Sequence, residues 1–283
     1  MKRPIDTRIP SAVEEQVTGI YRRVYPQGEA AFVSKAFNWV SECFAGHFAG
    51  YQPIDAGYHD FEHTLQGTLC LAQLLEGRHA AQASPAVSQK MFELALLAIL
   101  FHDTGYLKQK GDTEGTGAKY TPVHVGRSVV FAGEFLSRKG FPHPEITAVQ
   151  NMIRCTGVNA DLQSIPFQSD VEKMLGFALG TADLLGQMAA EDYVDKLPIL
   201  YQEFAEAARF SGPSSARLVT YASAEDLMRR TPDFWEKYVF PRIKGEFGGL
   251  YRFLNDPYPD GPNVYIQRIE ERISKLRQQL GSG

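Results

Sequence analysis

The segment MFELALLAILFHDTGY (Met91–Tyr106) decides the fold. Ten of its first eleven residues are apolar, and a histidine and an aspartate, His102 and Asp103, follow at once. A helix that is apolar nearly all round lies inside a protein rather than on its surface. A carboxylate carried there costs on the order of several kcal/mol unless it is protonated, ion-paired or bound to a metal. The segment therefore predicts a buried helix over residues 87–103 that delivers His102 and Asp103 to the interior.

The rest of the chain also has a helical pattern. Apolar residues recur at three- and four-residue spacing, and no segment shows sustained period-two alternation. We expect one all-α domain over residues 1–283, a multi-helix bundle whose motif-bearing core spans about 51–245 and whose last helix could be an appendage. Besides 87–103, the predicted helices are 11–24, 29–49, 58–76, 123–139, 144–156, 168–190, 192–210, 224–244 and 263–280.

Composition narrows the class of protein. The 283 residues are 44% hydrophobic and 22% charged, as in ordinary globular proteins, and the net charge of −4 favours neither nucleic acid nor an anionic membrane as partner. Three scattered cysteines without a CxxC pair argue against a disulfide framework or a thiolate zinc site. The N-terminus has no apolar signal region, and no apolar run reaches membrane-spanning length. The expected location is the cytoplasm.

Residues of the types that bind metal ions also lie on two other predicted helices. His59 and His63, in YHDFEHT, are four residues apart and would share one face of a helix. An isolated pair of this kind is more often two partly exposed histidines. Asp183, in MLGFALGTADLLGQM, lies four residues after Leu179 on the inward face of its helix. With His102 and Asp103, histidines and carboxylates from three helices converge.

This combination of side chains predicts a metal centre. Mixed histidine and aspartate ligation suits zinc, iron or manganese, and the carboxylates could share a bridging water or a second, harder ion such as magnesium. Without a thiolate, such a site keeps coordination positions free for water and substrate. That is typical of catalytic rather than structural sites.

The ordered motifs resemble the HD-domain metal-dependent phosphohydrolase superfamily, and within it the class I cyclic-nucleotide phosphodiesterase branch. YHDFEH is similar to that family's Tyr-His-Asn-x-x-His motif, and LAILFHDTGY is similar to its His-Asp motif. LGTADLLGQM is similar to its Ala-Asp metal motif, and DFWEKYVFPRI to its nucleotide-pocket helix. The resemblance runs in order from about residue 58 to about residue 243, and it implies an HD-type helical bundle.

The resemblance also implies roles for single residues. His63, His102, Asp103 and Asp183 would hold a first metal ion, zinc, iron or manganese. Asp103 would also bridge to a second ion, magnesium or manganese. A metal-activated hydroxide would attack phosphorus, and His59 would be the general acid that protonates the leaving alkoxide. The expected reaction is hydrolysis of a small-molecule phosphoester, a phosphodiester of a nucleotide or a related compound.

The sequence departs from the phosphodiesterase pattern at two positions. Tyr106 stands where that family has a further histidine, and His124, in TPVHVGRS, could take over near the second metal or could be an exposed residue at a helix start. Thr231 stands where the family has the glutamine that reads the purine. The resemblance assigns substrate contacts to Tyr58, Thr231 and Phe234, but it does not extend to a cyclic-nucleotide substrate.

Weaker features have two interpretations each. The loop GDTEGTGAKY lacks the GK[ST] ending and preceding strand of a phosphate-binding loop, so a surface loop is expected. Alternatively Lys108 or Lys119 touches phosphate there. Arg127 and Arg154 are expected in surface salt bridges, with phosphate binding as the alternative. The aromatic residues around 234–240 could stack on a base or belong to the core.

Two other functions remain open on the sequence alone. An HD-fold di-iron oxygenase would use similar ligands, since histidine and aspartate serve iron well. A non-catalytic nucleotide-binding sensor would keep the fold without turnover. The sequence does not predict the oligomeric state.

Overall fold

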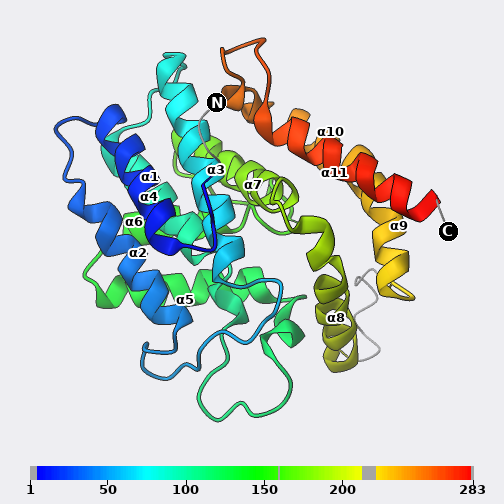
Figure 1. Cartoon of the computed structure of the whole chain (residues 1–283). Helices are drawn as coiled ribbons and strands as arrows, with labels where there is room; N and C mark the ends of the chain where they lie inside the picture. Colours follow the sequence, from blue (N-terminus) through cyan, green and yellow to red (C-terminus); the bar gives the residue numbers. More distant parts are fainter. Residues whose placement is uncertain (1–4, 159, 212–220, 282–283) are drawn as a thin grey trace.

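The computed structural model describes residues 5–158, 160–211 and 221–281, and this part of the chain is helical (Figure 1). Within it there are no strands, only isolated bridges between Tyr51 and Gln109 and between Asn255 and Asn263. The predicted all-α fold class is therefore confirmed. The α-helices are α1 (Pro10–Val24), α2 (Ala31–Phe44), α3 (Phe61–Ala80), α4 (Gln89–Phe101), α5 (His124–Arg138), α6 (His143–Ile153), α7 (Asp170–Met188), α8 (Tyr193–Ser211), α9 (Ala224–Phe234), α10 (Phe240–Lys244) and α11 (Val264–Gly281).

Short tighter or wider turns connect some of these helices. The 3-10 helices are η1 (Thr104–Tyr106), η2 (Gly117–Tyr120) and η4 (Leu250–Leu254), and η3 (Trp235–Val239) is a π-helix. In Figure 1, α1 and α2 lie on one flank and α9 and α11 on the other, with α3 and α7 between them. Among the described helices, none is both long and apolar enough to cross a bilayer.

Helix α4 is the buried helix that the opening segment predicts. The Ser88 side chain caps its start by accepting a hydrogen bond from the Met91 amide, and every residue from Phe92 to Phe101 is buried. The helix packs against α2, α3, α6 and α7. It ends at His102, so the ligand-type residues leave the helix from the interior of the bundle.

Helices α3 and α7 make the most extensive helix pair, and glycines allow their backbones to approach closely. A Cβ atom added at Gly186 would lie 2.7 Å from the carbonyl of Gln66, and one added at Gly67 would lie 3.6 Å from the Cα of Asp183. His63 lies one turn before Gly67 on α3. The close approach therefore brings His63 and Asp183 together.

The prediction that His59 and His63 share a helix face is wrong. Helix α3 begins at Phe61, because Asp60 is its N-cap and accepts a hydrogen bond from the His63 amide at 2.8 Å. Aspartate is among the preferred N-cap residues, since its side chain satisfies an amide that no helical carbonyl can reach. His59 precedes the cap, in the turn that enters α3, and its ring nevertheless lies 5.2 Å from that of His63.

The segment expected as one helix over 224–244 contains a π turn. Pro241 has no N–H with which to continue the regular helical hydrogen bonding. Just before it, the Phe240 N–H bonds to the carbonyl of Trp235, five residues back, which is the spacing of a π-helix. Helices α9 and α10 therefore meet through η3 rather than as one regular helix.

The last helix belongs to the main core. Ile269, Ile273 and Leu276 of α11 are buried in the same apolar cluster as the other helices, and α11 packs on α7, α8 and α9. The suggestion that it is an appendage does not agree with these contacts. The three cysteines are free and buried.

Candidate metal centre

Four side chains from three places in the fold meet at one point. His63 comes from α3, His102 and Asp103 from the end of α4, and Asp183 from α7. His63 Nε2 lies 3.2 Å from Asp103 Oδ2 and 3.2 Å from Asp183 Oδ1, and His102 Nε2 lies 3.2 Å and 3.4 Å from the same two oxygens. None of the four residues is more than 7% exposed. The structure thus brings together the first-metal residues expected from the sequence.

The donor atoms fit a metal ion better than a hydrogen-bond network. With bonds of about 2.1 Å, neighbouring ligands of a metal lie about 3.0 Å apart in an octahedron and about 3.4 Å apart in a tetrahedron, close to the distances measured here. His102 Nε2 and Asp103 Oδ2 are buried and have no hydrogen-bond partner among the described residues, although buried polar atoms almost always have one. Among the described residues, only histidines form ion pairs with Asp103 and Asp183.

The histidine tautomer also suits metal binding. His102 Nδ1 lies 2.7 Å from the Ile99 carbonyl, which can only accept, so in the neutral ring Nδ1 carries the proton and Nε2 has the lone pair. Thr104 closes the same turn by donating to the Phe101 carbonyl at 2.8 Å. The end of α4 therefore fixes the orientation of the imidazole.

Without a metal, the histidines and the carboxylates stabilise each other's charged forms. Burial lowers the pKa of His63, but the carboxylates of Asp103 and Asp183 outweigh burial and raise it to about 9. Burial likewise raises the pKa values of both carboxyl groups, but the charge of His102 and the other histidine outweigh it and lower them. A metal ion entering this site would have to displace protons from the imidazoles.

His124 lies near Oδ1 of Asp103, the carboxylate oxygen that is not shared with His63 and His102. Its Nε2 lies 3.9 Å from Asp103 Oδ1, and its Nδ1 lies 2.7 Å from the Thr121 carbonyl, which leaves Nε2 with the lone pair. The residue begins α5 and is half-buried, and burial lowers its pKa. Of the two interpretations of His124, exposed helix start or neighbour of a second ion, this geometry favours the second.

His59 is held by an acid that the sequence analysis did not identify. Glu203 of α8 is buried, and its Oε2 lies 2.5 Å from His59 Nδ1. Its Oε1 accepts the amides of Tyr58 and His59 at 2.7 Å and 3.3 Å. Burial raises the pKa of Glu203, but the charge of His59 outweighs burial and lowers it. One signal existed: Glu203 lies three residues after Leu200 and four before Ala207, on the inward face of its helix.

Tyr106 stacks against both His59 and His124. Its ring stacks on His59 with a centroid distance of 4.4 Å and an angle of 12°, and on His124 at 4.8 Å and 23°. The phenol ring is completely buried. The residue that departs from the phosphodiesterase pattern thus contacts both histidines, whose own ring centroids lie 6.1 Å apart.

Gly105 has a packing role beside these residues. A Cβ atom there would lie 2.0 Å from the His124 carbonyl, and the Gly105 amide donates to Ser128 Oγ at 2.8 Å. The absence of a side chain therefore lets η1 approach the start of α5. This contact places Asp103 and His124 next to each other.

The cations of the neighbouring loop have partners in the protein. Lys108 pairs with Asp55 at 2.8 Å and donates to the Gly115 carbonyl, and Lys119 pairs with Asp112. Arg127 donates to the carbonyls of Gly105 and Leu107, both at 2.7 Å. These contacts support the ligand-bearing turn, and Arg154 is exposed on the surface.

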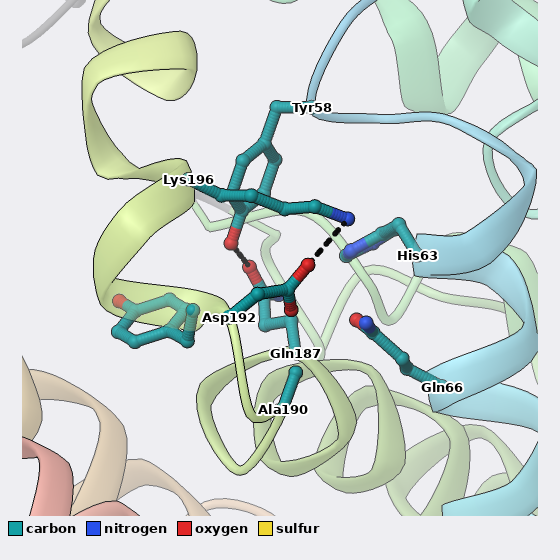
Figure 2. A pocket seen from close by; sticks show the side chains of 8 residues that line it. Tyr58, His63, Gln66, Gln187, Ala190, Asp192 and Lys196 are labelled. Atoms are coloured by element: carbon teal, nitrogen blue, oxygen red, sulfur yellow. Dashed lines mark hydrogen bonds and ion pairs between the residues drawn. The ribbon is translucent and has the colours of Figure 1, made fainter. Parts of the chain in front are cut away.

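Tyr58 lines a small cleft on the other side of His63 (Figure 2). Its hydroxyl donates to Gln187 at 2.9 Å, and two further lining residues, Lys196 and Asp192, form an ion pair at 3.2 Å. The free volume is about 10 Å³, roughly the space of one water molecule. The cleft reaches His63 but has no room for a substrate in this conformation.

The other expected substrate contacts belong to packing. The Thr231 hydroxyl is buried and donates to the Leu227 carbonyl at 2.9 Å. Phe234 stacks on Tyr238 at 5.1 Å. Helix α9, which carries both residues, packs mainly on α8, η3 and α11. The structure does not bring Thr231 or Phe234 into contact with the four donor residues.

Fold and site together define an all-helical protein with a buried histidine–aspartate centre suited to a metal ion. The chain belongs to the Npun_R2479-like family, whose model matches residues 6–114 and 110–252. These residues include the four donors as well as His59, Tyr106, His124 and Glu203, whereas α11 lies beyond them. A comparison with the curated proteins gives no match.

Proposed function

We propose that the protein is a metal-dependent phosphohydrolase of the HD type that cleaves a phosphodiester of a nucleotide or a related small molecule. One observation carries the proposal: the Nε2 atoms of His63 and His102 each lie at metal-ligand spacing from carboxylate oxygens of Asp103 and Asp183. Among the described residues, His102 Nε2 and Asp103 Oδ2 have no hydrogen-bond partner. The order of these residues along the chain matches the resemblance to the HD superfamily.

The residues would have different roles in the hydrolysis of a phosphoester. His63, His102, Asp103 and Asp183 would hold a first ion, zinc, iron or manganese, and Asp103 Oδ1 with His124 Nε2 would offer donors to a second, magnesium or manganese. Such ions supply a nucleophile at neutral pH and polarise the phosphoryl group. The second oxygen of Asp103 faces His124, so this carboxylate can serve both positions.

His59 would deliver a proton to the leaving oxygen. Its Nδ1 bonds to the Glu203 carboxylate, which fixes the ring plane. The ring lies 5.2 Å from that of His63 and 6.1 Å from that of His124. Because Glu203 occupies Nδ1, the proton to be transferred resides at Nε2.

A substrate and metal panel tests this function. The purified protein would be loaded separately with Mn²⁺, Mg²⁺, Fe²⁺ or Zn²⁺ and given aryl phosphodiesters and nucleotide phosphoesters. We expect turnover with at least one metal, and Asp183→Asn should show none. Oxygen consumption by the iron-loaded protein without any phosphoester hydrolysis would contradict the proposal and favour an oxygenase.

A further inference from the structure

The hydroxyl of Tyr106 is a buried polar group that the described part of the chain leaves without a hydrogen bond. The side chain is completely buried, and its hydroxyl has no hydrogen-bond partner among the described residues. A buried hydroxyl without a partner destabilises a protein, so native structures rarely keep one unless a ligand or water completes it. A phenylalanine would fill the same space without this penalty.

The surroundings place the ring of Tyr106 close to the candidate metal centre. The ring stacks on both His59 and His124. Burial raises the pKa of the phenol, and the charges of Asp103, Glu203 and Asp183 contribute to the same shift. The side chain thus lies against His59, which would be the acid, and against His124, which would offer a donor to the second ion.

The hydroxyl of Thr121 is the nearest alternative hydrogen-bond partner for the hydroxyl of Tyr106. It is close enough to influence the pKa of Tyr106, but it donates its own proton to the Ala118 carbonyl at 2.7 Å. A contact between the two hydroxyls does not meet hydrogen-bond geometry here. Thr121 therefore provides the control for any role given to Tyr106.

We propose that Tyr106 is a catalytic residue whose hydroxyl donates a hydrogen bond to a phosphoryl oxygen of the substrate, while its ring keeps His59 and His124 aligned. The inference rests on the proposed phosphohydrolase function and adds a residue to it. A phenol supplies a donor without a positive charge, in a region where Lys108, Lys119 and Arg127 are already engaged by the protein.

Binding of inorganic phosphate tests the donor without requiring turnover. Titration of the metal-loaded protein by calorimetry should give a dissociation constant about tenfold or more higher for Tyr106→Phe than for wild type, the loss expected for a hydrogen bond to a charged group. Metal content, measured on the same samples, should be unchanged. With an aryl phosphodiester, kcat should fall about 100-fold, as for one lost donor to developing charge.

Thermal unfolding of the metal-free protein separates this role from a structural one. Tyr106→Phe should unfold at the same temperature as wild type or a higher one, because it removes a hydroxyl without a partner. A lower unfolding temperature would mean that the hydroxyl is bonded within the protein. Thr121→Val should leave phosphate affinity unchanged, and a loss equal to that of Tyr106→Phe would overturn the inference.

The outcomes distinguish the two proposals. If phosphate binding weakens in Tyr106→Phe but no phosphoester is hydrolysed by wild type, the proposed function fails and the role of Tyr106 as anion donor stands. If wild type hydrolyses phosphoesters and both proteins bind phosphate equally, the inference about Tyr106 fails. If the metal-loaded wild type binds no phosphate, both are overturned.

Discussion

At the scale of single residues, local chemistry explains what the sequence could and could not predict. His63, His102, Asp103 and Asp183 were predictable because each stands on the apolar face or at the apolar end of a helix. The inward position of Glu203 had a local signal, but its contact with His59 did not, because that contact joins residues 144 positions apart. The contacts of Tyr106 with His59 and His124 likewise join different segments of the chain.

Glu203 has a measurable positioning role. Glu203→Gln keeps the shape of the side chain but removes the carboxylate that holds His59 Nδ1, so kcat should fall roughly 10- to 100-fold, part of the contribution of general acid catalysis. KM and metal content should stay near wild type. Steady-state kinetics of Glu203→Gln, His59→Ala and the double variant provide the check. Independent, multiplying losses in the double variant would contradict the pairing of the two residues.

Asp183 should be required for metal and not only for turnover. Asp183→Asn removes one of the two carboxylates at the centre, and the metal content of the purified protein should fall well below that of wild type. Asp170→Asn is a matched control, since Asp170 lies on the same helix and is exposed. Elemental analysis of the three proteins would refute the ligand role if Asp183→Asn retained full metal.

The raised pKa of His63 leads to a prediction about how the stability of the metal-free protein depends on pH. In the metal-free protein this pKa is raised from 6.5 to about 9, so the stability it contributes is complete below pH 6.5 and is lost as the pH rises through about 9. The unfolding temperature of metal-free protein should therefore fall between these pH values. Metal-saturated protein should not show this fall, because a metal needs the imidazole unprotonated. An equal fall in both forms would contradict the assignment of His63.

At the scale of elements, the helical periodicity predicted the helices to within a few residues, but it could not predict where capping or proline intervenes. Asp60 starts α3 later than expected and leaves His59 in a turn. Pro241 is accompanied by a π turn before α10. In both places a single side chain or a missing N–H donor determines the local backbone conformation. The periodic pattern of apolar residues continues through these positions and does not reveal the change.

The contact between α3 and α7 can be tested at a glycine. The Cβ of Gly186→Ala would lie 2.7 Å from the Gln66 carbonyl, and overpacking of this kind costs about 1–3 kcal/mol. The unfolding temperature and the metal affinity should both decrease, because His63 and Asp183 move apart. Gly126→Ala on α5 is the control: nothing lies within 4 Å of the added atom, so the unfolding temperature should stay or rise. Unchanged metal affinity in Gly186→Ala would contradict the link between this contact and the site.

At the scale of the whole molecule, one apolar cluster joins the helices from α1 to α11. The buried helix α4 brings His102 and Asp103 into this cluster, and α3 and α7 bring His63 and Asp183 to the same point. The opening segment predicted the first of these facts, because a helix without a polar face has to be buried. It could not predict that α11, beyond the residues of the family match, completes the core.

The rate of aryl phosphodiester hydrolysis before chelation, after chelation and after restoring Mn²⁺ tests the central claim most directly. If the buried histidine–aspartate centre is a metal-dependent hydrolase site, hydrolysis should stop on chelation and return with metal in wild type, and it should be absent throughout in Asp183→Asn. Hydrolysis that survives chelation, or that Asp183→Asn retains, would contradict the account.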